Sequence, residues 1–356
     1  MYRPTKAYIH LPALRHNLQV VKTMAPNSKV LAVIKANGYG HGIDRVAHQF
    51  SSADGYGVAC IDEAIILRQK GFLHRILLLE GLFSEAEIPL VYQHRLDLVV
   101  HSFHQLKWLL ESQYQATINV WVKIDSGMHR LGFHPDEVAD VINQLEKSDK
   151  PFQIHLASHL ASADESEDFT LKQINCFNDA SKGYTYPKSL ANSAGLQEFK
   201  QAQYQWVRPG IMLYGAGQCK SCRPALKPVM KLVSEVTALK KVKKGEYVGY
   251  GNTWQAQRDS YVGIVAIGYG DGYPRHAPTG TPVLVNGQRV SLIGRVSMDM
   301  ICVDLTELEG QVRIGDEAIL WGDESLGVDE IAEFAGTIGY ELLCGITQRV
   351  PIIEVQ

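Results

Sequence analysis

Short apolar runs alternate with longer segments of helical period through the first two thirds of the chain. The runs predict β-strands at residues 30–34, 56–59, 75–79, 97–100, 118–124, 153–157, 189–191 and 205–208. The segments between them predict helices, for example at residues 61–70, 135–147 and 169–181. Eight apolar strands separated by helices are typical of parallel βαβ units and favour a closed (β/α)8 barrel, an α/β fold. An open doubly wound sheet is the competing topology, because counting strands does not separate the two.

The pattern changes near residue 225, after which strands dominate. They are predicted at residues 230–239, 261–267, 281–285, 289–293, 301–305 and 318–321. Turn dipeptides such as Asn286-Gly287 separate the strands, and residues 329–336 leave room for a helix. We therefore expect a barrel domain over residues 1–226 and a smaller all-β domain over residues 227–356.

Composition narrows the class of protein. Of the 356 residues, 46% are hydrophobic and 21% are charged, which is typical of a globular protein. The net charge of -3 gives no basic field for nucleic acid or an anionic membrane, so neither is expected as a partner. The start of the chain lacks the apolar core of a signal peptide and is expected to turn soon into an amphipathic helix. With only six cysteines, we expect a cytoplasmic protein without a disulfide framework.

In barrels of this kind the reacting groups lie at the carboxyl ends of the strands and in the loops that follow. Here these positions carry Lys35, Arg130, His159, Ser193 and Arg208. Each has an ordinary explanation on its own. A lysine that ends an apolar strand, for instance, usually extends its amine into solvent. Convergence of all of them on one barrel mouth favours a functional site.

The positions of these residues indicate what the mouth holds. The loops after the seventh and eighth strands form the usual phosphate site of such barrels, and here they supply Ser193 and the amides of Gly210 and Ile211. A lysine in the mouth forms a Schiff base when its neutral amine is favoured. Phosphate at one end and such a lysine at the other describe pyridoxal 5'-phosphate (PLP). The glycine-rich segment at residues 38–42 matches neither a dinucleotide fingerprint nor a P-loop.

No metal site is expected. Cys219 and Cys222 have the spacing of half a zinc site, but no second pair lies at a suitable distance along the chain.

Several motifs run through both domains: residues 32–42 (AVIKANGYGHG), 126–132 (SGMHRLG), 207–211 (VRPGI), 248–251 (VGYG), 267–272 (IGYGDG) and 294–299 (GRVSMD). With these motifs the sequence resembles the alanine racemase family of fold-type III PLP enzymes over its full length. The resemblance implies an isomerase that interconverts L- and D-alanine with PLP and acts as a homodimer. It leaves open whether D-alanine supplies peptidoglycan or is degraded.

The resemblance also implies roles for individual residues. Lys35 would carry PLP and act as the base on the D-alanine side. Tyr250 would be the base on the L-alanine side and would reach the barrel mouth of the other subunit. Further cofactor contacts would come from Tyr39, Arg130, His159, Asn192, Ser193, Arg208, Gly210 and Ile211. Substrate contacts would come from Arg130, Tyr269, Met298 and Asp299.

Within these sets, Arg208 would face the pyridine nitrogen and Arg130 the phenolic oxygen of PLP. His159 would pack on the ring and link Arg208 to Tyr250, and the Met298 amide would bind the substrate carboxylate. Lys123 matches a lysine that relatives can carbamylate and pair with the arginine at position 130. Two positions depart from the family pattern: many relatives have cysteine in place of Ser297, and some have a phosphate-contacting tyrosine in place of Gln348.

The proposed residues suit racemisation. Inverting a Cα centre requires a base on each face of the substrate, and Lys35 and Tyr250 would supply them. A guanidinium only donates hydrogen bonds, so Arg208 would keep the ring nitrogen unprotonated, where a transaminase would place a carboxylate. A broad-specificity racemase would use the same machinery and stays open as an alternative. A fold-type III decarboxylase fits less well, because no Cys-acidic signature is present, and a single-domain PLP carrier would lack the β-domain.

Overall fold

The computed structural model describes residues 3–217, 219 and 225–356. These residues form two compact units. The barrel unit comprises Arg15–Leu213 and Gly217–Leu226, and the strand-rich unit comprises Met1–Leu14, Tyr214–Ala216 and Lys227–Gln356. Among the described residues, no helix is both long enough and apolar enough to cross a membrane.

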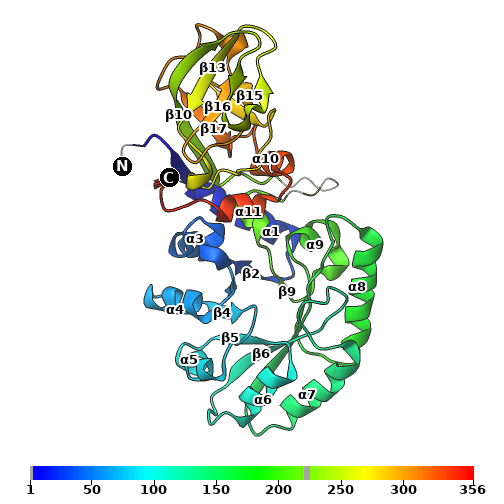
Figure 1. The fold of residues 1–356 in the computed structure, drawn as a ribbon. Helices are drawn as coiled ribbons and strands as arrows, with labels where there is room; N and C mark the ends of the chain where they lie inside the picture. The colour runs from blue at the N-terminus through cyan, green and yellow to red at the C-terminus, as the bar shows by residue number, and fades with distance from the viewer. Residues whose placement is uncertain (1–2, 218, 220–224) are drawn as a thin grey trace. The chain divides into compact units, whose positions relative to one another are not determined.

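Parallel strands close into a barrel in the first unit (Figure 1). The eight strands are β2 (Lys29–Val33), β3 (Gly55–Val58), β4 (Arg75–Leu78), β5 (Asp97–Val100), β6 (Ile118–Lys123), β7 (Phe152–Ala157), β8 (Lys188–Ser189) and β9 (Trp206–Val207). The first and last strands pair in parallel, with Lys29 opposite Trp206 and Val30 opposite Val207. The predicted barrel is therefore confirmed, and the open doubly wound sheet is excluded.

Helices alternate with the barrel strands, as the sequence predicts. They are α2 (Lys35–Tyr39), α3 (Ile43–Gln49), α4 (Ile61–Gln69), α5 (Ile88–Gln93), α6 (Phe103–Glu111), α7 (Val138–Glu146), α8 (Glu167–Ala180) and α9 (Ser193–Glu198). Short 3-10 turns occur at η1 (Glu85–Glu87), η2 (Pro135–Glu137), η3 (Lys200–Ala202) and η4 (Ile211–Tyr214). The helices expected at residues 61–70, 135–147 and 169–181 correspond to α4, to η2 with α7, and to α8.

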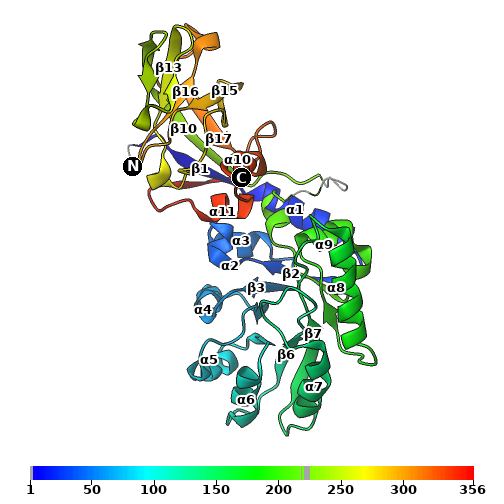
Figure 2. The same ribbon diagram turned by 45° about the vertical axis from the view of Figure 1, so that its right-hand side comes forward.

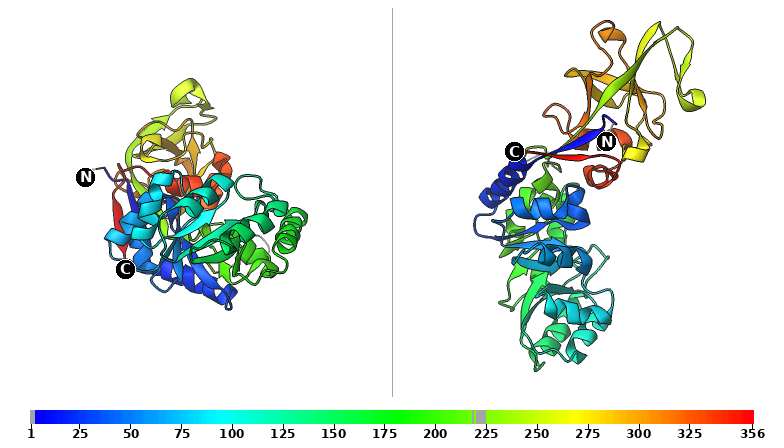
Figure 3. Two further views of the ribbon diagram at one scale, coloured as in Figure 1. Left: turned by 90° about the horizontal axis from the view of Figure 1, so that it is seen from below. Right: turned by 90° about the vertical axis from the view of Figure 1, so that its left-hand side faces the viewer.

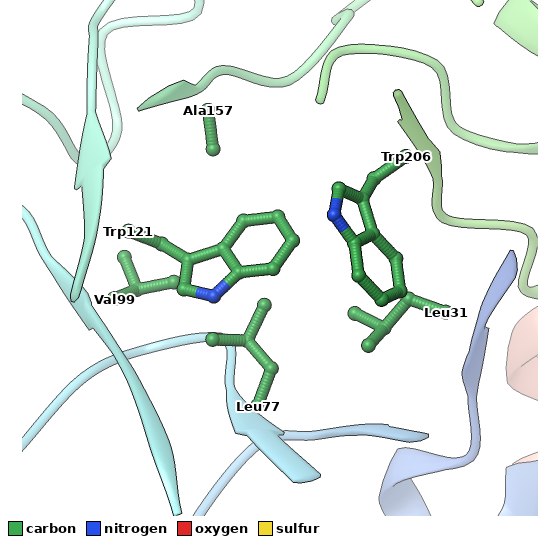
Figure 4. Packing of buried hydrophobic residues seen from close by; sticks show 6 residues of the cluster. All are labelled: Leu31, Leu77, Val99, Trp121, Ala157 and Trp206. Atoms are coloured by element: carbon green, nitrogen blue, oxygen red, sulfur yellow. The ribbon is translucent and has the colours of Figure 1, made fainter. Parts of the chain in front are cut away.

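The barrel interior is filled by a layer of apolar side chains rather than open (Figure 4). Its members are Leu31, Leu77, Val99, Trp121, Ala157 and Trp206, each at most 4% exposed. The rings of Trp121 and Trp206 meet edge to face, with centroids 5.6 Å apart. Removing a side chain as large as Trp121 from such a layer costs about 3–5 kcal/mol of stability.

A polar network lies at the amino ends of the barrel strands. The buried Asp97 carboxylate accepts hydrogen bonds from Trp121 Nε1 (3.1 Å) and Asn119 Nδ2 (3.0 Å) and pairs with the Arg75 guanidinium at 3.1 Å. His155 stacks on Trp121 with ring centroids 4.5 Å apart, and its Nε2 lies 3.3 Å from Arg75 Nη1. Because a guanidinium only donates, this contact requires an unprotonated Nε2.

This network predicts that the folded state becomes less stable as the pH falls below about 6.5. Burial, together with the charges of Arg75 and Lys29, lowers the pKa of His155 from 6.5 to about 4. The unfolded chain therefore takes up a proton first, so His155 stabilises the fold fully above about pH 6.5 and loses this contribution as the pH falls towards 4. The contribution is on the order of 3 kcal/mol. Urea unfolding of wild type and His155→Gln between these pH values measures it.

The difference in the pH dependence of stability between wild type and His155→Gln isolates the contribution of His155. Asp97 faces Arg75 in the same network, and its pKa is raised by burial, so its titration acts in the opposite direction in both proteins. His41, whose pKa burial also lowers to about 4, is likewise present in both. Equal pH slopes for wild type and variant would contradict the assignment to His155.

The second unit is built mainly from antiparallel strands (Figure 2). They are β10 (Met230–Val242), β13 (Ser260–Val265), β14 (Pro282–Val285), β15 (Gln288–Ile293), β16 (Ile301–Asp304) and β17 (Glu317–Trp321). Their order is β13-β16-β15-β14-β17-β10, and β13 also pairs with β10, so the pairings run in a ring. A separate short ladder joins β11 (Tyr247–Val248) to β12 (Trp254–Gln255). The unit also holds helices α10 (Val328–Ala335) and α11 (Gly339–Cys344).

Two strands of this sheet come from the ends of the chain and were not predicted. β1 (Lys6–His10) pairs antiparallel with β10 and parallel with β18 (Ile352–Val355), so the first and last strands of the chain lie side by side (Figure 3). The chain thus forms a strand before helix α1 (Leu11–Met24) begins. The signal for β1 is a strict alternation, because Ala7 and Ile9 are fully buried while their neighbours are only partly covered.

Candidate active site

The turn that follows β2 carries Lys35 and has an unusual backbone. The four residues from Ala36 to Tyr39 all have positive φ, between 51° and 63°. For residues other than glycine this conformation costs roughly 1–2 kcal/mol each, so the surroundings must hold it in place. A Cβ on Gly38 would lie 2.7 Å from Val46 Cγ2, so glycine is required there.

Side chains from neighbouring elements fix this turn. Asn37 Oδ1 accepts the Ile43 amide at 2.9 Å. The fully buried His41 places Nδ1 2.8 Å from the Tyr39 carbonyl oxygen and 3.0 Å from that of Gly38. Because burial keeps His41 neutral, its ring acts as a fixed hydrogen-bonding support. His41 therefore supports the backbone at Gly38 and Tyr39.

The ends of β2, β8 and β9 bring hydroxyl and amide groups together. Ser193 Oγ accepts the amides of Gly210 (2.9 Å) and Met212 (3.4 Å). The phenol oxygen of Tyr39 would lie 2.5 Å from a Cβ on Gly210, so only glycine lets the two approach. Asn192 caps α9 through Oδ1, which accepts the Gly195 amide at 2.9 Å. Ile211, the residue after Gly210, is the first residue of η4.

Arg208 is buried beneath this cluster, where β9 ends. Its guanidinium donates to Ser189 Oγ and to the carbonyl oxygens of Ser158 and Leu190. Burial lowers the pKa of Arg208 to about 10, so the group stays charged at neutral pH. Acceptors from β8 and from the residue after β7 thus hold one positive charge in a fixed orientation.

Four other predicted residues carry positive charges that act on His159, which follows β7. Burial lowers the pKa of His159 well below its usual value, and the charges of Lys123, Arg208, Arg130 and Lys35 add to the effect. Burial, with Arg208 and Arg130, likewise lowers the pKa of Lys123 to about 7. The structure therefore gathers the predicted cations at one end of the barrel. This concentration of positive charge suits an anionic ligand.

The loop after β6 is shaped by Asp125. Its Oδ1 accepts the amides of Gly127 and His129, each at 3.0 Å, and these bonds outweigh burial and lower its pKa. Ser126 Oγ lies 2.8 Å from Ser158 Oγ, which ties the loop to the end of β7. The exposed Arg130 is carried by this loop.

Sequence reasoning missed one charged group beside Lys35. Glu80, the second residue after β4, places Oε1 3.8 Å from Lys35 Nζ. The rule that identified the other residues, a polar side chain just after a barrel strand, would have identified this one too. The carboxylate offers the lysine an acidic neighbour at the barrel mouth.

The other predicted residues lie in the strand-rich unit and form their own group of loops. Tyr250 opens the 3-10 turn η5 (Tyr250–Asn252) and is 70% exposed. Tyr269 opens η6 (Tyr269–Asp271), and its amide donates to the Ser297 carbonyl at 3.0 Å. Met298 is 51% exposed, and Asp299 is held by Arg349 at 2.6 Å. The loop with Gly249 and Gly251 lies beside Arg295, since Cβ atoms on these glycines would come within 3.6 and 3.4 Å of it.

The two cysteines with zinc-like spacing do not bear on this site. Cys222 lies outside the described residues, and Cys219 is buried. Within the described ranges, no three His, Cys, Asp or Glu side chains are grouped so as to hold a metal ion.

Comparison with known proteins covers the whole chain. The family described as "Alanine racemase, N-terminal domain" matches residues 9–218, and "Alanine racemase, C-terminal domain" matches residues 229–354. Alanine racemase from Vibrio cholerae serotype O1 is 48% identical over 351 residues, which are 97% of this chain and 96% of that protein.

Solved structures agree with the family match. The biosynthetic alanine racemase from Pseudomonas aeruginosa has a TM-score of 0.96 and 44% identity, covering 99% of this chain and 100% of its own. The alanine racemase from Acinetobacter baumannii has a TM-score of 0.93 and 39% identity, with the same coverage. The barrel and the strand-rich unit thus both have counterparts in these proteins, and the chain belongs to the alanine racemase family.

Proposed function

We propose that the protein interconverts L- and D-alanine with PLP, using Lys35 and Tyr250 as its two bases. The observation that carries this proposal is the arrangement of one barrel mouth. Lys35, the hydroxyls of Tyr39 and Ser193, and a group of cations that includes the buried Arg208 occupy the carboxyl ends of its strands. The same strand ends hold Gly210, Ile211 and Asn192, which we assign to the cofactor site.

The residues present fit PLP chemically. Lys35 offers a primary amine for the aldehyde, while Tyr39, Ser193 and the amides of residues 210–211 offer donors for the phosphate. Arg208, fixed by Ser189 and by backbone carbonyls, is suited to donate to the ring nitrogen. Arg130 is suited to the phenolic oxygen. These assignments use the group of positive charges that the protein places around His159.

When bound, PLP supplies the covalent link to the substrate amine and the electron withdrawal that makes the Cα proton acidic. Lys35 Nζ then takes or returns this proton on the D-alanine face. The Tyr250 oxygen does the same on the L-alanine face, and it must be deprotonated to act as a base, although a phenol normally titrates near pH 10. We assign stabilisation of that anion to His159 and Arg208.

Substrate binding is assigned to the strand-rich unit together with Arg130. The Met298 amide binds the alanine carboxylate, Asp299 lies beside it, and Tyr269 stands at the entrance. We propose that residues 1–226 hold the cofactor and that residues 227–356 supply the second base to the partner's barrel. The exposed position of Tyr250 supports a homodimer with shared sites.

Chiral analysis of L-alanine incubated with the PLP-loaded protein tests the activity, with L-serine and L-lysine in parallel. We expect alanine to approach an equal mixture of enantiomers, with little change in the other two. Comparable conversion of lysine would instead indicate a broad-specificity racemase with the same residues. No conversion of any substrate, with PLP attached to Lys35, would overturn the proposal.

Lys123 is expected to carry a carbamate. A lysine whose pKa is lowered to about 7 has a substantial neutral fraction at physiological pH and can react with carbon dioxide, and Arg130 and Arg208 would compensate the new negative charge. Incubation with 13C-bicarbonate should give a carbamate carbonyl signal in 13C NMR. The signal should be absent from Lys123→Arg and present in Lys147→Arg, which changes a solvent-facing lysine in the same unit. A signal of equal strength in Lys123→Arg would contradict the assignment.

A further inference from the structure

The strand-rich unit contains a carboxylate, Asp271, that is completely buried. Its Oδ2 lies 2.8 Å from Arg3 Nη2 and accepts the Gly268 amide at 3.0 Å. Its Oδ1 lies 3.4 Å from Arg349 Nε. A buried carboxylate is unfavourable unless it is paired, and the guanidinium groups of Arg3 and Arg349 supply the opposite charges.

Each arginine also reaches a second loop. Arg349 Nη2 binds Asp299 Oδ1 at 2.6 Å, and Arg3 Nη2 donates to the Asp299 carbonyl at 3.2 Å and the Ala266 carbonyl at 3.1 Å. The two guanidinium groups therefore connect the 268–272 loop to the 297–299 loop. We call Arg3, Asp271 and Arg349 the arginine clamp.

The backbones of the two loops fit closely at this point. The amides of Tyr269 and Gly270 donate to the carbonyls of Ser297 (3.0 Å) and Met298 (2.9 Å). A Cβ on Gly268 would collide with those carbonyls, and a Cβ on Gly270 would collide with the Arg349 guanidinium. Thr347 Oγ1 adds a hydrogen bond to the Gly270 carbonyl at 2.9 Å. The orientation of the peptide units at Met298 is thus set by the clamp and by this close contact.

We infer that the arginine clamp positions the Met298–Asp299 segment so that it can bind the substrate carboxylate. Arg3, Asp271 and Arg349 are positioning residues: they act through the backbone and need not touch substrate. This inference rests on the proposed function, which assigns the carboxylate to the Met298 amide. It also gives Arg3, which precedes β1 near the start of the chain, a part in substrate binding.

Kinetics of Arg349→Gln and Asp271→Asn, each as PLP-loaded enzyme, test the inference. A contact made equally in the ground and transition states changes KM rather than kcat. We expect KM for alanine to rise about tenfold or more, while kcat changes by no more than about threefold. The inhibition constant of propionate, a carboxylate without an amine, should weaken by a similar factor. Arg349→Lys, which keeps the charge, should recover part of the loss.

Arg289→Gln is the matched control, because it breaks an exposed pair with Glu330 in the same unit without touching either loop. A merely structural clamp would lower the melting temperature and leave KM and propionate inhibition unchanged, which would overturn the inference. If Asp271→Asn does not fold, Arg349→Gln and Arg3→Gln supply the same measurements. If the wild-type enzyme racemises alanine normally and the variants keep an unchanged KM, the inference about the arginine clamp is refuted and the proposed function stands. An inactive wild type would refute the proposed function.

Discussion

Lys35→Ala is expected to lower alanine racemisation by roughly 10³-fold or more, because the variant loses both the point of cofactor attachment and one of the two bases. Borohydride reduction followed by peptide mass analysis should find PLP on the peptide with Lys35 in wild type and no covalent PLP in the variant. The variant keeps Tyr39, Ser193 and Arg208, to which we assign non-covalent contacts with the cofactor, so weak cofactor binding should persist.

Lys70→Ala is a suitable control for this experiment. Lys70 belongs to the barrel unit but forms an exposed ion pair with Asp44, 3.5 Å away. The control should keep both activity and covalent cofactor. Covalent PLP on another lysine of Lys35→Ala, together with substantial activity, would show that the cofactor site is wrongly assigned.

The barrel could be predicted from sequence because its strands are buried on both sides. Such strands appear as uninterrupted apolar runs, as in residues 30–34 and 98–100, and every expected barrel strand is found. Closure could not be derived from the runs themselves. It depends on the pairing of β2 with β9, which joins Lys29 to Trp206 across most of the unit. β1 and β18 were missed for a related reason, because a five-residue alternation becomes a strand only through partners from the other end of the chain.

In the candidate site, too, some features could be predicted from the local sequence, while others depend on contacts between distant residues. Polar residues just after barrel strands could be identified one by one, since the topology brings strand ends together. Their protonation could not be derived in this way. The lowered pKa of Lys123 depends on burial and on the charges of Arg208 and Arg130, which come from different loops. The contact of Asp271 with Arg3 and Arg349 joins three distant parts of the sequence, and no local pattern indicates it.

Tyr250→Phe is the second substitution with a large expected effect. Removing the phenol oxygen removes one base, and racemisation should fall by about 10²- to 10⁴-fold. Because the two enantiomers have equal free energy, kcat/KM must fall equally in both directions. Exchange of the Cα proton with deuterated water separates the two faces. The variant should still exchange D-alanine through Lys35, while exchange of L-alanine should be lost.

Tyr247→Phe provides the matched control, since Tyr247 is another exposed tyrosine, 53% accessible, three residues earlier. It should racemise like wild type and exchange both enantiomers. Equal exchange of L- and D-alanine by Tyr250→Phe would contradict the assignment of Tyr250 to one face.

The same two variants test whether Tyr250 serves the partner's barrel. In a mixed dimer of Lys35→Ala and Tyr250→Phe chains, shared sites would place the intact Lys35 opposite the intact Tyr250 in one of the two sites. Random assembly makes half of the dimers mixed, so co-expression of two inactive chains should restore about one quarter of wild-type activity. If each chain used its own Tyr250, every site of the mixed dimer would lack one base, and no activity would return. Recovery therefore requires both the dimer and the exchange of Tyr250 between its subunits.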